Sequence, residues 1–213
     1  LMARKPPSTL EDIVPEYRSR NPLVRWLFLK RLDVAERLAH LDETEPLTLL
    51  DVGCGEGLLL KRLKAGWPRH AVEGMDHRPE VTSLDVPGVT LFAADLTKPG
   101  ALPAARYDRL FALDVLEHLK DLDAPLAALR AALKPGGLLV LSAPTENLLH
   151  KSCRFLIKGT FSEEEGPCSS PHCHRAATLA PAVAAAGFEP VDSVSLPLPG
   201  PFALNRLFSF RRA

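Results

Sequence analysis

The hydrophobic pattern of the chain is strongest where an apolar run ends in alternating glycines. Residues 47–57 read Leu-Thr-Leu-Leu-Asp-Val-Gly-Cys-Gly-Glu-Gly, and an apolar run of this kind is typical of a strand buried on both faces. Residues 58–64 then place leucines at helical spacing, with lysine and arginine between them. Strand, glycine turn and helix form the first unit of a doubly wound α/β sheet, in which ligands bind at the carboxyl ends of the strands.

Further apolar runs follow at the spacing of repeated strand and helix units. They predict strands over residues 70–76, 89–94, 107–113 and 138–142, helices over 121–133 and 176–186, and two closing strands over 188–196 and 206–212. Residues 134–137, Lys-Pro-Gly-Gly, predict a sharp turn before the fifth strand, because proline lacks an N–H and glycine tolerates unusual φ angles. The pattern predicts a Rossmann-like α/β sheet of seven strands, mostly parallel with one antiparallel strand near the C-terminus, and helices on both faces.

The 213 residues suit a single α/β domain, within which four segments differ in pattern. Residues 1–46 predict an N-terminal cap that contains a helix over 22–41. Residues 47–143 are the predicted ligand-binding core. Residues 144–174 interrupt the α/β rhythm with proline, glycine and an acidic run, and an insertion of this length is expected to be functional or mobile. Residues 175–213 hold the final helix and the closing strand hairpin.

The spacing of the three glycines separates two classes of ligand. A dinucleotide fingerprint has the order G-x-G-x-x-G, and Leu58 stands where its third glycine would fall. The chain instead has Asp51, followed by glycines at positions 53, 55 and 57. This order resembles the cofactor loop of class I S-adenosylmethionine-dependent methyltransferases, and the resemblance implies S-adenosyl-L-methionine as the cofactor. A structural turn in another α/β protein is the alternative; an NAD enzyme comes last, because the glycine spacing contradicts it.

Acidic residues follow the next predicted strands at their carboxyl ends. Asp76 lies 25 residues beyond Asp51, about the distance at which doubly wound folds place an acid on a ribose. The resemblance implies that Asp95 accepts a hydrogen bond from the adenine amino group, although an acid here also suits a cap of the next turn. The predicted cofactor-binding residues are Asp51, Gly53, Cys54, Gly55, Gly57, Asp76, His77, Asp95, Leu96, Asp114 and Val115.

The end of the fourth predicted strand carries information about the methyl acceptor. Residues 114–119 read Asp-Val-Leu-Glu-His-Leu. Families that methylate nucleic acids or glutamine side chains end this strand in Asn/Asp-Pro-Pro-aromatic, and cytosine C5 enzymes need a Pro-Cys pair; neither stands here. The segment resembles small-molecule methyltransferases of the ubiquinone-biosynthesis O-methyltransferase type, and the resemblance covers residues 47–143. It implies an apolar or ring-bearing small-molecule acceptor that is methylated on oxygen. It also implies that residues 144–174 form a lid over the substrate pocket.

The chemistry that this resemblance implies is direct in-line displacement at the methyl carbon. An oxygen nucleophile needs its proton removed, and histidine is the usual general base near neutral pH. His118 and His174 are the predicted catalytic bases, with His150 and His172 as further candidates. His118 also suits a structural place on the first turn of its helix. A carboxylate or an acidic phenol as acceptor needs no base.

A cluster of cysteine and histidine within the predicted lid offers potential zinc ligands. Residues 168–174 read Cys-Ser-Ser-Pro-His-Cys-His, and both residue types bind zinc. His172 and His174 flank Cys173 directly, however, and adjacent ligands rarely converge on one ion without strain. The loop also lacks a second Cys-x-x-Cys pair that would stiffen it. We therefore expect no metal site.

Charge and composition narrow the partners and the location. The chain has 26 Lys and Arg against 26 Asp and Glu, and this balance argues against a nucleic acid partner. Four scattered cysteines, without a cleavable signal pattern or an apolar run long enough for a bilayer, favour a cytoplasmic location. Trp26, Phe28 and the basic residues within 22–41 leave peripheral membrane contact as a second interpretation of that helix.

Two other functions remain open on the sequence. One is a methyltransferase that acts on RNA or protein, which an extended basic patch on the folded surface would favour. The other is a protein that binds S-adenosylmethionine without catalysis, as a partner or regulator, with a lid too short to enclose a pocket.

Overall fold

The computed structural model describes residues 22–145 and 173–213, so most of the predicted lid and the start of the cap lie outside the described residues. Its α-helices are α1 (Pro22–Leu38), α2 (Leu58–Gly66), α3 (Asp123–Ala132) and α5 (Ala176–Ala185), and its short 3-10 helices are η3 (Pro79–Ser83), η4 (Leu116–His118) and η5 (Gly200–Phe202). Its strands are β1 (Thr48–Val52), β2 (Ala71–Asp76), β3 (Val89–Ala93), β4 (Tyr107–Ala112), β5 (Leu133–Pro144), β6 (Phe188–Pro197) and β7 (Ala203–Arg212).

The seven strands form one sheet in the order β3-β2-β1-β4-β5-β7-β6. Strands β1 to β5 are parallel to one another, and β7 runs antiparallel to both of its neighbours, β5 and β6. The strand order reverses between β1 and β4, so the carboxyl ends of these two strands flank the switch point where doubly wound sheets bind ligands. The predicted fold class is confirmed.

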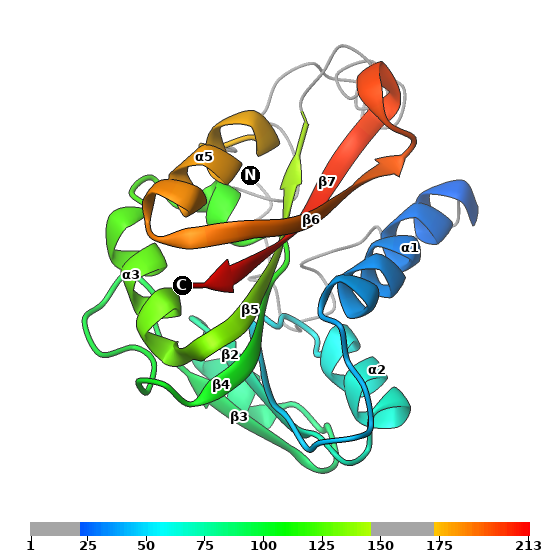
Figure 1. Cartoon of the computed structure of the whole chain (residues 1–213). Helices are drawn as coiled ribbons and strands as arrows, with labels where there is room; N and C mark the ends of the chain where they lie inside the picture. Colours follow the sequence, from blue (N-terminus) through cyan, green and yellow to red (C-terminus); the bar gives the residue numbers. More distant parts are fainter. Residues whose placement is uncertain (1–21, 146–172) are drawn as a thin grey trace, which may run out of the picture.

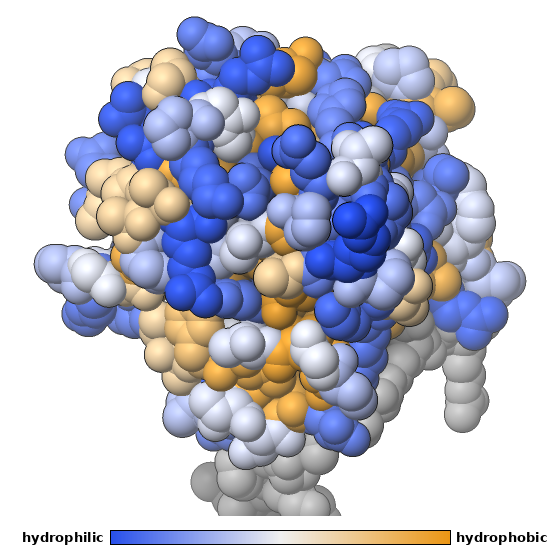
Figure 2. Space-filling view, turned by 60° about the horizontal axis from the view of Figure 1, so that its bottom comes forward, coloured by the Kyte–Doolittle hydropathy of each residue, from blue (hydrophilic) through white to orange (hydrophobic). Residues whose placement is uncertain are grey.

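Both faces of the sheet are buried, because the apolar side chains of the central strands point in turn to one face and to the other. Leu49 of β1 packs in the cluster on the side of α1 and α2, whereas Leu50 packs in the cluster on the side of α3 and α5, because successive side chains of a strand point to opposite faces. Figure 1 shows the two pairs of helices on opposite sides of the sheet. The face seen in Figure 2 is largely hydrophilic, with hydrophobic residues in patches between the polar ones.

Strand β5 begins earlier than the sequence predicts. The predicted turn over 134–137 lies inside this strand, which starts at Leu133. In the pairing with β4, Tyr107 lies opposite Leu133 and Arg109 lies opposite Leu138, so residues 134–137 bulge out between two paired positions. Gly136, with a φ of 75°, supplies the conformation that such a bulge requires.

Helix α1 covers the sheet with one side and faces solvent with the other. Leu32, Ala35 and Leu38 are buried against the sheet, whereas Leu23 and Trp26 near the start of the helix are 68% and 49% exposed. The predicted cap helix is thus present, although it ends three residues before the predicted boundary. Among the described helices, none is both long enough and apolar enough to cross a membrane.

We expect Gly74→Ala to destabilise the sheet at the middle of β2. An added Cβ would stand 2.5 Å from Leu60 Cδ1 and 2.8 Å from Leu91 Cδ2, and Leu60 is fully buried. Overpacking of this kind costs about 1–3 kcal/mol of unfolding free energy, measurable by urea denaturation. Gly66→Ala at the end of α2 is the control, because its Cβ would meet nothing within 4 Å; alanine there should stabilise the helix by about 0.5–1 kcal/mol. Equal effects of the two substitutions would contradict the crowding at Gly74.

Candidate active site

The glycine turn after β1 lies directly against the end of β2. The N–H of Gly53 donates to the carbonyl oxygen of Met75 at 2.7 Å. Gly53, Gly55 and Gly57 have φ angles of 70°, 54° and 71°, which residues with side chains rarely adopt. A Cβ at Gly53 would stand 2.5 Å from Val115 Cγ2, whereas a Cβ at Gly55 would meet no atom of the described residues within 4 Å. The backbone at Gly55 is therefore open to the approach of a ligand.

Two other residues of the predicted cofactor loop are buried. Asp51 is 4% exposed at the end of β1, and burial, together with the negative charge of Asp76, raises its pKa to about 8. Cys54 is also buried, and burial raises the pKa of its thiol above the usual range. Burial therefore favours the protonated carboxyl of Asp51, whereas a cation placed beside it would favour the ionised form.

Asp76, the last residue of β2, has hydrogen-bond partners on both carboxylate oxygens. Oδ2 accepts from the N–H of Gly55 at 3.1 Å and from Arg78 Nη2 at 3.0 Å. Oδ1 accepts from the N–H of Arg78 at 3.1 Å and from Arg78 Nε at 2.9 Å. Burial raises the pKa of Asp76, but the hydrogen bonds and charge of Arg78 outweigh burial and hold it below its usual value. Asp76 is therefore a buried, ionised carboxylate that touches the glycine turn.

The remaining predicted residues near β2 and β3 lie at the same edge of the sheet. The exposed ring of His77 places Nδ1 at 3.1 Å from Asp76 Oδ1. Asp95 follows β3 and accepts hydrogen bonds from the hydroxyl of Thr97 at 2.7 Å and from its N–H at 2.9 Å, which lower the pKa of Asp95. Asp95 therefore caps the turn that follows β3, which was one of the two roles that the sequence allowed for it. Its contact with adenine stays a prediction. Leu96 is buried in the core beside it.

Asp114 follows β4 with a φ of 56°, which is unusual for a residue with a side chain. Its N–H donates to Ser142 Oγ at 2.9 Å, and the Ser142 hydroxyl donates to Asp114 Oδ1 at 2.8 Å. Asp114 Oδ2 forms an ion pair with Arg31 of α1, whose side chain is 4% exposed. Burial raises the pKa of Asp114, but the charge of Arg31 and the two hydrogen-bond partners outweigh it and lower the pKa. The pair joins the cap helix to the carboxyl ends of β4 and β5.

Glu117 is buried in η4, close to Asp114. Burial and the negative charge of Asp114 raise the pKa of Glu117 well above its usual value, which favours the protonated carboxyl. The backbone oxygen of Glu117 accepts from the N–H of Cys173 at 2.6 Å and from that of His174 at 3.2 Å. The segment that opens α5 is thereby held beside η4, which also contains His118. The two predicted catalytic bases thus come from segments that meet at the end of β4.

Four residues that shape this edge were not predicted to do so: Arg31, Arg78, Ser142 and Glu117. Arg31 had a signal in the sequence, since it lies three residues after Phe28 and four before the buried Ala35, on the apolar stripe of its helix. In the structure its guanidinium lies 4.8 Å from the ring centre of Phe28. Arg78 lies two residues from an acid, which is a common arrangement without functional meaning. Ser142 had no signal that distinguishes it from other polar residues at strand ends.

The described part of the chain contains no candidate metal site. Within residues 22–145 and 173–213, no group of three or more His, Cys, Asp or Glu side chains is arranged to hold a metal ion. Cys173 is exposed and His174 is half-buried. The other members of the Cys168–His174 segment, and the candidate base His150, lie outside the described residues.

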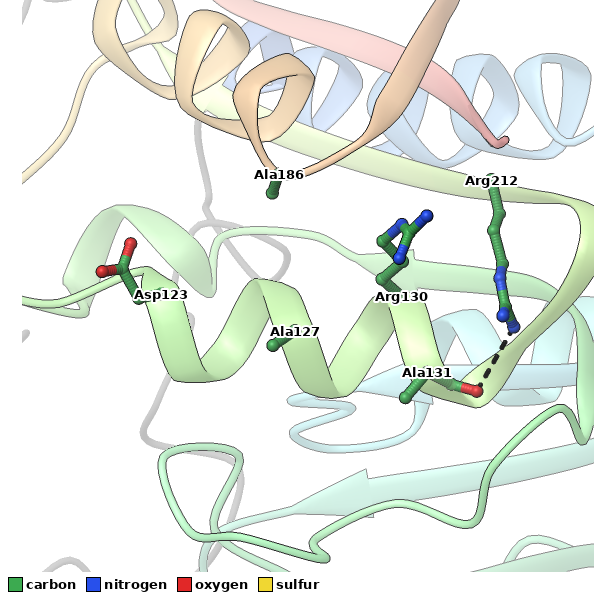
Figure 3. Close-up of a pocket in the computed structure, with 6 residues that line it drawn as sticks. All are labelled: Asp123, Ala127, Arg130, Ala131, Ala186 and Arg212. Carbon is green, nitrogen blue, oxygen red and sulfur yellow. Dashed lines mark hydrogen bonds between the residues drawn. The ribbon is translucent and has the colours of Figure 1, made fainter.

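A groove of about 410 Å³ lies between α3, Ala186 at the end of α5 and Arg212 at the end of β7 (Figure 3). Arg130 and Arg212 line it near the amino end of β5, with Asp123 toward the other end of α3. Both guanidinium groups donate hydrogen bonds to the backbone. Arg130 Nε donates to the carbonyl oxygen of Gly187 at 3.3 Å, and Arg212 Nη1 donates to that of Ala131 at 3.4 Å. None of the predicted site residues lines this groove, so it is separate from the edge that carries the buried acids.

We expect Arg31→Met to destabilise the protein by about 3–5 kcal/mol, since it leaves the Asp114 carboxylate buried without its cation. Urea denaturation measures the loss, and Asp114→Asn in the same background should restore part of it by removing the orphaned charge. Lys30→Met is the matched control, because its 3.5 Å pair with Asp33 is exposed and is worth at most about 1 kcal/mol. Similar losses for the two single variants would show that the Arg31 pair contributes no more than a surface pair.

A second prediction concerns the pH dependence of stability. Because the pKa of Glu117 is raised in the folded protein, the folded state binds a proton that the unfolded chain releases above about pH 4.3. The contribution of Glu117 to stability therefore falls as pH rises from that value toward the raised pKa. Glutamine at this position does not titrate, so Glu117→Gln removes this loss. The unfolding free energy of the variant minus that of the wild type should therefore increase as pH rises, which urea denaturation at a series of pH values measures. The exposed Glu80→Gln is the control, and a widening difference in both variants would contradict the assignment.

Comparison with known proteins agrees with this geometry. Residues 23–193 match the methyltransferase domain family. A trans-aconitate 2-methyltransferase of Methylobacterium nodulans is 33% identical over 125 residues, which are 57% of this chain and 47% of that protein. A ubiquinone biosynthesis O-methyltransferase of Cereibacter sphaeroides is 40% identical over 113 residues, 48% of this chain and 43% of that protein. The chain thus spans less than half the length of these relatives.

Two longer matches add to this. A ubiquinone biosynthesis O-methyltransferase of Methylobacterium nodulans is 32% identical over 180 residues, 76% of this chain and 69% of that protein. The fold is similar to that of the N-methyltransferase NodS from Bradyrhizobium japonicum WM9, solved with S-adenosyl-L-homocysteine, at a TM-score of 0.66 and 18% identity over 95% of this chain and 94% of that one. With most of its length matched and the glycine turn at the switch point of the sheet, the chain belongs to the methyltransferase domain family, among the class I S-adenosylmethionine-dependent methyltransferases.

Proposed function

We propose that this protein transfers the methyl group of S-adenosyl-L-methionine to an oxygen atom of a small-molecule acceptor. The curated relatives that it resembles are named for ubiquinone biosynthesis and for trans-aconitate, and the end of β4 lacks the Asn/Asp-Pro-Pro-aromatic pattern of enzymes that methylate planar amines. In this proposal Asp76 accepts the ribose hydroxyls, Asp95 the adenine amino group, and the turn around Gly55 lies against the rest of the cofactor.

The observation that carries the proposal is the surplus of buried acid at the carboxyl edge of the sheet. Asp51 and Glu117 both have raised pKa values there, because burial and the negative charge of a neighbouring aspartate dominate at each carboxyl. Bound S-adenosylmethionine brings a positive sulfonium with an electrophilic methyl carbon. A positive charge placed here lowers the free energy of the ionised carboxyl groups, so the donor set fits this cofactor.

The acceptor side of the site is proposed at η4 and the start of α5. The positive charge of His118 is among the causes that lower the pKa of Asp114, so the two groups lie within electrostatic reach. An imidazole that takes a proton from the acceptor hydroxyl is stabilised by such a carboxylate. The site must also hold the acceptor oxygen in line with the methyl carbon and the sulfur. Orientation of this kind lowers the barrier by about 7–11 kcal/mol.

The exposed start of α1 keeps the peripheral membrane contact of residues 22–41 within the proposal. Leu23 and Trp26 are exposed there, and aromatic and apolar residues beside basic ones suit an interface with lipid. Such contact would suit an apolar acceptor that partitions into a membrane.

The proposal is tested by acceptor screening combined with histidine variants. We expect S-adenosylhomocysteine to form with phenol, hydroxyl or carboxylate acceptors and not with amines. With a hydroxyl acceptor, kcat/KM should rise with pH through the pKa of the base, near 6.5 for an ordinary histidine. His118→Gln should lower kcat/KM about 10²- to 10⁴-fold and flatten this rise, while the dissociation constant for S-adenosylmethionine, measured by calorimetry, stays unchanged.

His174→Gln distinguishes the second candidate base, and His40→Asn, on the turn after α1, is the control. If the larger loss and the flattened profile appear in His174→Gln, the base assignment moves to His174. Turnover on RNA or protein alone would contradict the small-molecule acceptor. Cofactor binding without turnover on any acceptor would contradict the proposal in favour of a non-catalytic binding protein.

A further inference from the structure

The carboxylate of Asp76 is saturated with hydrogen-bond donors from the chain itself. Its side chain is 5% exposed, and Arg78 supplies three of its hydrogen bonds. Gly55 supplies a fourth, and His77 Nδ1 approaches to 3.1 Å. A carboxylate has about four lone-pair sites for such bonds. Hydroxyl groups that donate to Asp76 therefore have to displace a donor that is already there.

The hydrogen-bond donors to Asp76 differ in how easily a ligand can displace them. The N–H groups of Gly55 and Arg78 belong to the backbone, in the turn between β1 and α2 and in the turn between β2 and η3. The guanidinium of Arg78 is the donor at the end of a flexible chain, with the side chain 21% exposed. Its Nε and Nη2 atoms occupy Oδ1 and Oδ2, at 2.9 and 3.0 Å. This two-pronged contact engages both oxygens, as the two hydroxyls of a ribose diol would.

We infer that the Arg78 side chain is a latch that occupies the ribose site of the free protein and is displaced when the adenosine part of the cofactor binds. The inference rests on the proposed role of Asp76 toward the ribose. The latch keeps the buried carboxylate paired in the free protein, and it lowers the affinity for every ligand that carries the adenosine diol. It thereby acts on the cofactor and its product alike, independently of the methyl acceptor.

The test is calorimetric titration with S-adenosyl-L-homocysteine, which carries the ribose and lacks the sulfonium charge. We expect Arg78→Met to tighten binding about three- to tenfold, since a partly buried ion pair no longer has to be broken. Binding to the wild type should also tighten as sodium chloride rises, because salt screens the pair, and this salt dependence should diminish in Arg78→Met. Arg62→Met is the control, because Arg62 pairs with Asp33 and Glu36 outside the site.

A further variant separates the latch from the assignment on which it rests. Asp76→Asn should weaken binding of S-adenosylhomocysteine if Asp76 holds the ribose. Unchanged or weaker binding by Arg78→Met, together with weaker binding by Asp76→Asn, would overturn the latch and leave the ribose assignment standing. Unchanged binding by Asp76→Asn would overturn both. Thermal denaturation confirms that each variant is folded, and no arm uses an acceptor, so failure of the proposed O-methylation has no bearing on the outcome.

Discussion

Four carboxyl groups buried at one edge of the sheet are the constraint on which the rest of this site depends. They belong to Asp51, Asp76, Glu117 and, partly buried, Asp114. Two of them have a guanidinium partner, and their pKa values are lowered; the other two have raised pKa values because burial dominates. Removing a carboxylate from water is costly unless a cation or several hydrogen bonds replace the water. The surroundings therefore favour the ionised form at Asp76 and Asp114 and the protonated form at Asp51 and Glu117.

The two guanidinium partners, Arg78 and Arg31, differ in how far along the chain they lie from the acids that they pair with. Arg78 is local, since it lies two residues after its partner and closes a turn at the end of β2. Arg31 is remote, since 83 residues separate it from Asp114, and it reaches the edge only because α1 packs against the sheet. The Arg31 pair thus couples the position of the cap helix to the backbone at Asp114, which Ser142 of β5 also holds. Movement of α1 away from the sheet would expose a carboxylate next to the switch point.

The same distinction explains how far the sequence predicted this protein. Strand positions and the glycine turn follow from local patterns, because periodicity and φ preferences act over a few residues. The predicted cofactor residues lie at the ends of β1 to β4, since consecutive parallel strands bring their carboxyl ends to one edge. The ion pair of Arg31 depends on the packing of α1 against the sheet. The place of Arg31 on the apolar stripe of its helix predicts burial, but it does not identify Asp114, 83 residues away, as its partner. The start of β5 was misplaced because Gly136 and its neighbours read as a turn, whereas in the sheet they form a bulge between two paired positions.

Surplus acid at the edge also bears on turnover in the proposed reaction. Before methyl transfer, the acids of this edge face a cofactor with a sulfonium charge, and afterwards they face a product without it. The attraction exerted by Asp51, and the ease with which its carboxyl ionises, are therefore greater with the substrate form than with the product form. The Arg78 latch competes with both forms for Asp76, so it lowers both affinities alike and leaves this difference to the buried acids. Burial of acids without full pairing thus costs stability in the free protein and favours release once the methyl group has left.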